Sequence, residues 1–242
     1  MDEDLKNIKA AILAGGLGSR LRSVVSDRPK VMAEIGGRPF LEYLLHKLEK
    51  AGVSQVVLCT GHMGEIIRDT FGDAHGRMDL YYSRETLPLG TGGALRYALN
   101  LLDSESVLVM NGDSYCDADL NALWEFHQSK CAQTTLVLVK SADGRRYGHV
   151  RINSKGQVVS FDEKSEHAAA GWINAGIYLL KKELILSIPE GTGISLEKEM
   201  FPEWIGRGLY GFQSDGPFID IGIPEDYARA EQIMSPYQSD SR

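Results

Sequence analysis

The chain has 242 residues, of which 43% are hydrophobic and 24% charged, as in an ordinary globular protein. Its formal net charge of −7 argues against the broad basic surface that binds a nucleic-acid polymer. The three cysteines form no C-x-x-C pair, the first residues do not have the composition of a signal peptide, and no apolar run is long enough to span a membrane. We therefore expect a cytoplasmic protein with reduced thiols that binds neither nucleic acid nor membrane.

Hydrophobic periodicity divides the first part of the chain into alternating strands and helices. Fully apolar strands that alternate with helices are typical of a mostly parallel sheet with helices on both faces. In chain order we expect a strand at 8–14, a helix at 39–52, a strand at 54–60, a helix at 63–72, a strand at 78–83, a helix at 92–102, a strand at 106–113, a helix at 120–130 capped by Asp119, and a strand at 134–140.

The second part of the chain shows a different pattern. Residues 147–164 predict a pair of antiparallel strands, residues 172–180 predict one more strand, and residues 224–234 predict a helix that begins with a proline. The expected fold class is therefore α/β, with three layers, a mostly parallel central sheet and a small antiparallel insertion. Cys59 and Cys131 are expected in or beside buried strands, as small apolar residues.

A glycine-rich segment, LAGGLGSRL, follows the first expected strand. Gly15, Gly16 and Gly18 allow positive φ and let backbone N–H groups approach a ligand closely, an arrangement that holds phosphate oxygens. Arg20 and Lys30 add positive charge nearby. The spacing fits neither the dinucleotide fingerprint nor the P-loop. On the glycines alone, a flexible turn after a strand is the alternative interpretation.

The segments LAGGLGSRL and RPK resemble the signature of the sugar-nucleotide pyrophosphorylases, the sugar-1-phosphate nucleotidyltransferase family. The resemblance implies that Arg20 grips the β- and γ-phosphates of a nucleoside triphosphate and that Lys30 contacts the phosphorus under attack. The family's usual Pro-Leu-Thr is replaced here by residues 22–25, which leaves the path of the loop open. The loop residues implied to bind the nucleotide are Leu13, Ala14, Gly15, Gly16, Gly18 and Ser19.

The resemblance extends over nearly the whole chain and implies one nucleotidyltransferase domain with a Rossmann-like fold. Within it, residues 1–140 or so form the nucleotide-binding part, residues 141–220 or so form the part that binds the sugar phosphate, and residues 224–234 form the C-terminal helix. The sequence leaves the oligomeric state open.

A second glycine-rich block, PLGTGGAL, resembles the family segment that cups the nucleoside. It includes Gly90 and Thr91, and an N-cap role for Thr91 is the alternative. Glu85 stands where thymidylyl- and uridylyl-transferring relatives often carry Gln. A carboxylate only accepts hydrogen bonds and guanine offers two adjacent donors, so Glu85 favours GTP. The alternative for Glu85 is a solvated loop carboxylate.

Two aspartates are expected to hold Mg²⁺. Asp113, after Gly112, follows the apolar run VLVMN, and ligands gather at the carboxyl ends of such strands. Capping of a turn is the alternative for Asp113. The segment FIDIGIPEDYARA is similar to the family's last motif, with Phe218 in place of Trp and Ile223 in place of Thr. The resemblance makes its first aspartate, Asp220, the second Mg²⁺ ligand.

The acceptor side matches three family segments, in RRYGHV, FDEKSE and WINAGIYLL. The resemblance implies that Lys164 binds the sugar phosphate and that Glu163 and Asn174 bind sugar hydroxyls. It also implies that Gly148, next to Tyr147, approaches the sugar ring. Without this context the Glu163-Lys164 pair is the solvated end of a strand.

The expected reaction joins a nucleoside triphosphate, GTP by preference, to a sugar 1-phosphate. One oxygen of the acceptor phosphate attacks the α-phosphorus in line and pyrophosphate leaves, so catalysis consists of positioning and charge neutralisation. The wording VSDRPKVMAEIGGRPFLEYLL and NGDSY is most similar to the branch that guanylylates D-glycero-α-D-manno-heptose 1-phosphate for bacterial surface glycans. Mannose-1-phosphate guanylyltransferases and the uridylyl- or thymidylyltransferases of glucose and N-acetylmuramate 1-phosphates remain alternatives.

Two other classes of protein share this type of sheet. A non-catalytic sugar-nucleotide sensor typically lacks one of the charged residues that are all present here. A glycosyltransferase uses an Asp-x-Asp pair, and Asp117 and Asp119 have that spacing. We prefer helix capping as the role of these two aspartates.

Overall fold

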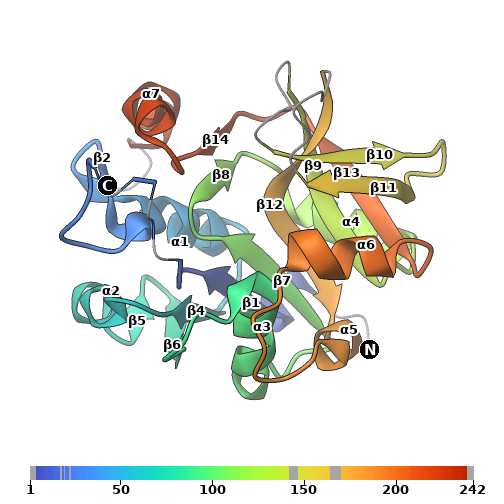
Figure 1. Cartoon of the computed structure of the whole chain (residues 1–242), viewed down its shortest axis with the longest axis horizontal. Coiled ribbons are helices and arrows are strands. Elements are labelled where there is room, and N and C mark those ends of the chain that lie inside the picture. The colour runs from blue at the N-terminus through green and yellow to red at the C-terminus, as the bar shows by residue number, and fades with distance from the viewer. Residues whose placement is uncertain are drawn as a thin grey trace.

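The computed structural model describes residues 4–16, 18, 20–21, 23–141, 147–163 and 170–238. Its centre is a ten-stranded sheet (Figure 1). Eight of its strands lie in the order β11-β10-β12-β7-β1-β4-β6-β5, and the other two, β9 and β13, are attached because β9 pairs with β12 and β13 pairs with β9. These strands are β1 (Lys9–Leu13), β4 (Gln55–Thr60), β5 (Ala74–His75), β6 (Met78–Arg84), β7 (Ser106–Asn111), β9 (Thr134–Ser141), β10 (Gly148–Ile152), β11 (Val158–Glu163), β12 (Gly171–Lys181) and β13 (Leu209–Ser214).

Two short antiparallel pairs lie outside the large sheet: β2 (Glu34–Ile35) with β3 (Arg38–Pro39), and β8 (Ser114–Cys116) with β14 (Phe218–Asp220). The α-helices are α1 (Phe40–Lys50), α2 (Gly64–Phe71), α3 (Gly90–Tyr97), α4 (Leu120–Ser129), α5 (Lys182–Ser187), α6 (Phe201–Trp204) and α7 (Pro224–Met234). Shorter turns of helix are η1 (Leu5–Asn7), η2 (Lys30–Met32), η3 (Ala98–Leu101), η4 (Leu196–Met200) and η5 (Ser235–Gln238). No helix in this described part is long and apolar enough to cross a bilayer.

The four strands at the middle of the sheet run parallel, because β1 pairs in parallel with β4 and β7, and β4 pairs in parallel with β6. Strand β12 joins β7 from the opposite direction and begins the antiparallel part. The pair β10–β11 is the antiparallel insertion that the sequence predicts. The expected α/β fold with a mostly parallel central sheet is confirmed.

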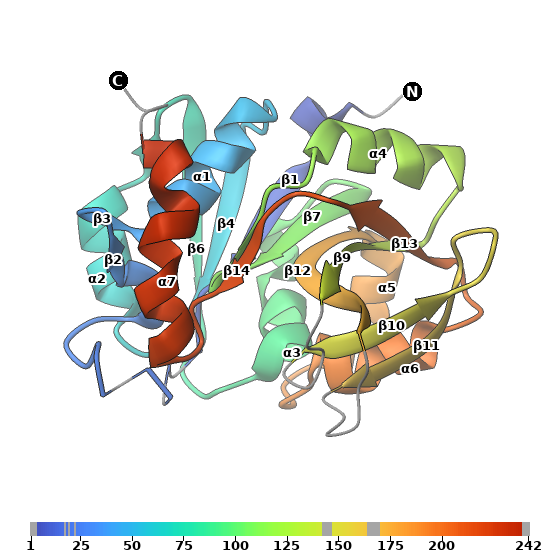
Figure 2. The same cartoon turned by 90° about the horizontal axis from the view of Figure 1, so that it is seen from above.

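Successive residues of β1 face different layers of helices, as the two-residue period of a strand requires. Ala10 and Ile12 belong to the core that contains the apolar faces of α1, α4 and α7. Ala11 belongs to the core on the other side, with Leu95 of α3 and Phe201 of α6. In Figure 2, α1 and α4 lie on one side of the sheet and α3 and α6 on the other. The fully apolar strands are therefore buried on both faces.

The helix ends follow local chemistry. Gly52, with φ of 86°, stops α1 one residue after its C-cap. Asp119 caps α4 by accepting from the N–H groups of Asn121 and Ala122, as expected. The helix expected at 92–102 instead begins at Gly90 and passes into the 3₁₀ turn η3 after Tyr97.

Strand β12 contains a bulge that opens toward the site described below. Its pairing with β9 changes register between Asn174 and Tyr178, and Gly176 within the bulge has φ of 75°. A Cβ at Gly176 would lie 2.5 Å from the hydroxyl oxygen of Ser114, so only glycine lets β12 approach β8 this closely.

Two expectations about residues that line neither cavity of the site described below are wrong. Cys131 is exposed, with φ of 45°, in the loop after α4 rather than beside a buried strand; Cys59 is buried in β4 as expected. Asp117 does not cap α4. It lies 3.6 Å from the ammonium of Lys47 and accepts a hydrogen bond from the hydroxyl of Tyr237 at 2.8 Å, because its backbone pairs with the chain before β14.

Candidate active site

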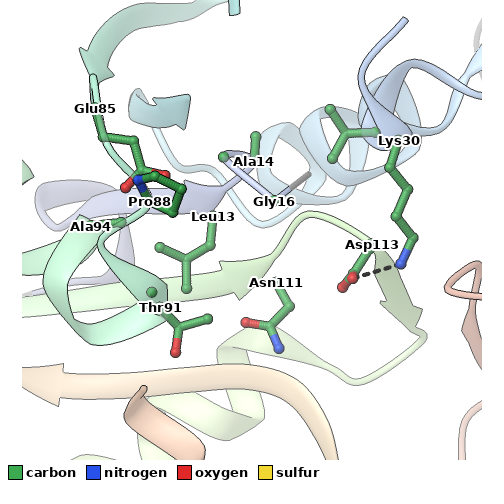
Figure 3. A pocket seen from close by; sticks show the side chains of 13 residues that line it. Leu13, Ala14, Gly16, Lys30, Glu85, Pro88, Thr91, Ala94, Asn111 and Asp113 are labelled. Carbon is green, nitrogen blue, oxygen red and sulfur yellow. Dashed lines mark hydrogen bonds and ion pairs between the residues drawn. The ribbon is translucent and has the colours of Figure 1, made fainter. Parts of the chain in front are cut away.

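The carboxyl ends of the parallel strands β1, β4, β6 and β7 lie at one edge of the sheet, and residues at or after the ends of β1, β6 and β7 line a cavity there (Figure 3). The chain runs from β1 to β4 on one side and returns to β7 on the other, and ligands bind at such a switch point. The cavity is lined by Leu13, Ala14, Gly15, Gly16, Lys30, Val31, Glu85, Pro88, Gly90, Thr91, Ala94, Asn111 and Asp113.

The glycines of the first loop have different roles. Gly18 has φ of 58° and so uses the positive φ that glycine allows, whereas Gly15 and Gly16 lie outside the left-handed region. Gly15 lets Glu85 keep its position in the cavity, since a Cβ there would lie 2.8 Å from Oε1 of Glu85. Gly16 has no atom within 4 Å of its Cβ position and borders the open cavity. Ser19 lies outside the described residues.

Glu85 follows β6 and turns into the cavity (Figure 3). Its carboxylate lies close to Gly15. It is half-buried, and its Oε2 accepts the N–H of Leu89 at 3.1 Å. Burial raises the pKa of Glu85, because it disfavours the charged form, and the Leu89 N–H partly opposes this. Glu85 is therefore not a solvated loop carboxylate but an acceptor within the cavity.

The glycine-rich start of α3 packs against another segment of the chain. Its helix N-cap is Leu89, so the N-cap interpretation of Thr91 is wrong. Thr91 Oγ1 instead accepts the N–H of Leu196 at 2.8 Å and donates to Glu197 Oε2 at 2.6 Å. A Cβ at Gly90 would lie 2.5 Å from the carbonyl oxygen of Ile194, so glycine permits this contact.

Asp113 and Asp220 converge on the ammonium of Lys30. The Nζ atom is 2.7 Å from Asp113 Oδ2 and 3.7 Å from Asp220 Oδ1. The antiparallel pairing of β8 with β14 sets Asp220 opposite Ser114, and the N–H of Ile221 donates to the carbonyl of Asp113 at 2.9 Å. Among the described residues, no group of three or more His, Cys, Asp or Glu side chains could hold a metal ion, so these two carboxylates stand as a pair.

A second cavity shares Asn111 and Asp113 with the first. The exposed Arg20 lines this second cavity, not the first. Its lining consists of Arg20, Asn111, Asp113, Ser114, Tyr147, Gly148, Asn174, Gly176, Glu197, Phe218, Asp220, Gly222 and Ile223.

The residues expected to bind an acceptor come from β10 and the bulge of β12. Tyr147 packs edge-on against Phe218, with ring centroids 5.4 Å apart, and Gly148 begins β10. Asn174 donates to the hydroxyl of Tyr178 at 2.8 Å and accepts the N–H of Gly176 at 3.0 Å.

Two further acceptor residues were expected from the segment FDEKSE. The backbone of Glu163 pairs with Gly148 in β11, but its side chain and the whole of Lys164 lie outside the described structure.

Gly112 has a structural role beside the site. Its N–H donates to the carbonyl of Leu13 at 2.9 Å, and a Cβ there would lie 2.7 Å from that oxygen and 2.9 Å from Val31 Cγ1. It packs the turn after β7 against β1 and lines neither of the two cavities described here.

Glu197 is a site residue that the sequence analysis missed. Its carboxylate accepts hydrogen bonds from the hydroxyls of Thr91 at 2.6 Å, Ser195 at 2.9 Å and Tyr178 at 3.1 Å, and from the amide of Asn111 at 3.4 Å. It therefore joins residues of both cavities. The only local signal is a helix start, since Ser195 caps η4, and that signal says nothing of the site.

The family model described as nucleotidyl transferase matches residues 9–235 of this chain. A D-glycero-α-D-manno-heptose 1-phosphate guanylyltransferase of Aneurinibacillus thermoaerophilus is 41% identical over 231 residues, which cover 95% of this chain and 100% of that protein. A mannose-1-phosphate guanylyltransferase of Mycobacterium tuberculosis is 37% identical over 226 residues, which cover 92% of this chain and 63% of that longer protein.

A solved structure, HddC from Yersinia pseudotuberculosis, superposes with a TM-score of 0.83 at 36% sequence identity, covering 93% of this chain and 98% of HddC. HddC in complex with GMP-PN superposes with a TM-score of 0.81. The family expected from the glycine-rich loop and the Pro-Lys pair is thus confirmed. This chain belongs to the nucleotidyl transferase family, and its similar relatives include sugar-1-phosphate guanylyltransferases.

Proposed function

We propose that this chain transfers GMP from GTP to D-glycero-α-D-manno-heptose 1-phosphate and releases pyrophosphate. The relative from Aneurinibacillus thermoaerophilus, matched over its full length, supports the heptose acceptor. The observation that carries the proposal is that two cavities meet at Asn111 and Asp113, where Lys30 lies between two aspartates. An α-phosphate from one cavity and an acceptor phosphate from the other would meet at this junction.

In this proposal the first cavity binds GTP. The backbone of residues 13–16 contacts the phosphates and ribose, Gly90 and Thr91 contact the nucleoside, and Glu85 accepts the N1–H and amino group of guanine. The half-buried position of Glu85 supports this role, because a carboxylate shielded from water discriminates more strongly between donor and acceptor edges.

The second cavity binds the acceptor. Asn174, Glu163 and the Gly148 backbone contact sugar hydroxyls and the ring, and Lys164 holds the sugar phosphate. The chain then acts as one domain, with nucleotide binding in the first 140 residues or so, acceptor binding up to residue 220 or so, and α7 after them. We further propose that the reaction takes place in the cytoplasm and serves bacterial surface glycans, as the resemblance implies.

We propose that Asp113 and Asp220 hold Mg²⁺. The donor set fits, because carboxylate oxygens are the ligands that Mg²⁺ prefers and both converge on one cationic atom, Lys30 Nζ. When bound, Mg²⁺ supplies Lewis-acid neutralisation of charge at the α-phosphate.

The side chains position the substrates and neutralise their charge during the reaction. One oxygen of the acceptor phosphate forms a bond to the α-phosphorus while the bond to the pyrophosphate oxygen breaks, and no side-chain base is required. Lys30 stabilises the α-phosphate, and Lys164 offsets the repulsion between the two substrates. Arg20 stabilises the leaving pyrophosphate, and this role requires the triphosphate to reach past Asp113 into the second cavity, which Arg20 lines. Loss of one such group costs on the order of 10²–10³ in rate, by comparison with lost oxyanion donors.

A pyrophosphate-release screen tests the proposal. Four nucleoside triphosphates are combined with heptose, mannose, glucose and N-acetylmuramate 1-phosphates, and the pair GTP and heptose 1-phosphate is expected to give the highest kcat/KM. Mannose 1-phosphate is the second candidate, because the Mycobacterium tuberculosis relative carries that name. An Asp113→Asn variant is the control for contaminating activity. No pyrophosphate release with any pair contradicts the proposal and leaves the sensor interpretation.

A further inference from the structure

The ammonium group of Lys30 fills the space between Asp113 and Asp220. The lysine side chain is only 12% exposed. Gly222 leaves room for it, since a Cβ at that position would lie 3.2 Å from Lys30 Nζ and 2.8 Å from Asp220 Oδ1. The N–H of Gly222 donates to the same Oδ1 at 2.6 Å and so fixes the oxygen that lies 3.7 Å from the lysine.

These carboxylates are also the ones that the proposed function assigns to Mg²⁺. Mg²⁺ binds carboxylate oxygens at about 2.0–2.1 Å. An ammonium group 2.7 Å from Asp113 Oδ2 would then stand within a few ångströms of the metal. Repulsion between a divalent and a monovalent cation at such a distance weakens binding by about tenfold or more even in water. Lys30 and a divalent cation therefore compete for the two carboxylates.

The position of Lys30 also connects it to the phosphate loop. Lys30 begins the short turn η2. Gly18 has a left-handed conformation and lies so close to this turn that a Cβ at Gly18 would be 3.2 Å from Lys30 Cβ. The loop that meets the triphosphate thus packs against the base of the lysine side chain. Its long flexible stem lets the ammonium change partners while the backbone stays in place.

We propose that, before the nucleotide binds, the ammonium group of Lys30 occupies the place of a metal ion between Asp113 and Asp220. When the nucleotide enters, the ammonium group leaves the two carboxylates and binds the triphosphate. This inference rests on the proposed function and adds an order of events to it. The phosphate oxygens make the exchange favourable, because they offer Lys30 new charge-assisted hydrogen bonds as it releases the carboxylates. Free divalent metal is then expected to bind weakly to the protein in the absence of nucleotide.

Mn²⁺ binding without nucleotide tests the inference, with free Mn²⁺ measured by electron paramagnetic resonance. Lys30→Met removes the competing charge, and Lys30→Arg keeps it. The double variant Lys30→Met with Asp113→Asn removes the metal ligand as well. Arg20→Met is the matched control, because Arg20 lines the same second cavity as both aspartates. Thermal unfolding confirms that each variant is folded.

Lys30→Met is expected to bind Mn²⁺ about tenfold more tightly than the unmodified chain. The gain should be lost in the double variant and absent in Lys30→Arg. A gain below threefold, or an equal gain in Arg20→Met, overturns the inference. The pyrophosphate-release screen is separate: if it fails while Lys30→Met still gains Mn²⁺ affinity, the proposed reaction is wrong and the competition stands.

Discussion

Gly15 and Glu85 approach each other so closely that a methyl group on Gly15 would lie 2.8 Å from Glu85 Oε1. Gly15 follows β1 and Glu85 follows β6, so two segments that are separated by β4 in the sheet meet across the first cavity. The phosphate loop and the carboxylate that we assign to guanine are therefore fitted to each other. A change in one is expected to alter the other.

Gly15→Ala is expected to turn the Glu85 side chain away, because the obstructing atom is the end of a flexible side chain. The preference for GTP over UTP should fall to the level of Glu85→Ala, with little loss of thermal stability. A double-mutant cycle of the two changes, read as kcat/KM for each nucleotide, should show strong non-additivity. Losses of preference that simply add would show that the two residues act separately. Gly16→Ala is a control for the stability measurement, since its Cβ position is open.

The affinity for GTP is expected to fall in mild acid. Burial raises the pKa of Glu85 above its ordinary value of 4.5, so the carboxylate that accepts from guanine becomes protonated at a higher pH than an exposed glutamate. Binding is complete above the raised pKa and is lost as the pH falls through it. Calorimetric titration of a GTP analogue from pH 4 to 8 measures this, and Glu85→Gln, which lacks the titrating group, should show a flatter profile.

Glu197→Gln is expected to weaken binding of both substrates. The hydroxyls of Thr91, Ser195 and Tyr178 all donate to the carboxylate of Glu197. The substitution replaces one of its acceptor oxygens with an NH₂ group, so that a donor faces donors. Because Thr91 lines the first cavity and Glu197 the second, KM for GTP and for the sugar phosphate should both rise, about tenfold for a loss of about 1.4 kcal/mol.

Ser195→Ala is the matched control for Glu197, since Ser195 donates to the same carboxylate but lines neither cavity. A smaller effect on both KM values is expected. An unchanged KM for both substrates in Glu197→Gln would remove Glu197 from the site.

His127 is expected to make the fold sensitive to acid. It is buried, its Nδ1 lies 2.8 Å from the hydroxyl of Thr135, and burial lowers its pKa from 6.5 to about 4. Between pH 6.5 and about 4, His127 binds a proton in the unfolded chain but stays neutral in the folded chain. The free energy of unfolding therefore falls as the pH is lowered from 6.5 toward 4. The slope is about 1.4 kcal/mol per pH unit.

Urea unfolding at a series of pH values measures the contribution of His127. His127→Gln should flatten the dependence between pH 6.5 and 4, whereas substitution of the exposed His62 should leave it unchanged. Parallel curves for His127→Gln and the unmodified chain would contradict the assignment.

Much of the central fold is predictable from the sequence, because a strand buried on both faces is a continuous apolar run. Such a run can be recognised without knowing which strands it pairs with. The strands around Ile12, Leu58 and Met110 are of this kind. Residues 182–214 show no such pattern, because their helices have six residues or fewer and their burial depends on contacts with distant strands. Short elements carry little periodic signal.

The site divides in the same way. The convergence of Asp113 and Asp220 was expected only through resemblance, because the pairing of β8 with β14 that causes it involves three residues on each strand. The contact of Thr91 with Glu197 had no local signal at all. It depends on the docking of Ile194 against the start of α3, a relationship between segments about a hundred residues apart that no window along the chain can reveal.

Strand β12 serves two neighbours along one edge: Ile173 pairs with β10, and the stretch from Ile177 onward pairs with β7. The hairpin β10–β11 therefore joins the sheet before the bulge in chain order, apart from the parallel strands that form the nucleotide cavity. Replacement of this hairpin by that of a relative would therefore be expected to change the preference for the acceptor while the nucleotide cavity keeps its structure.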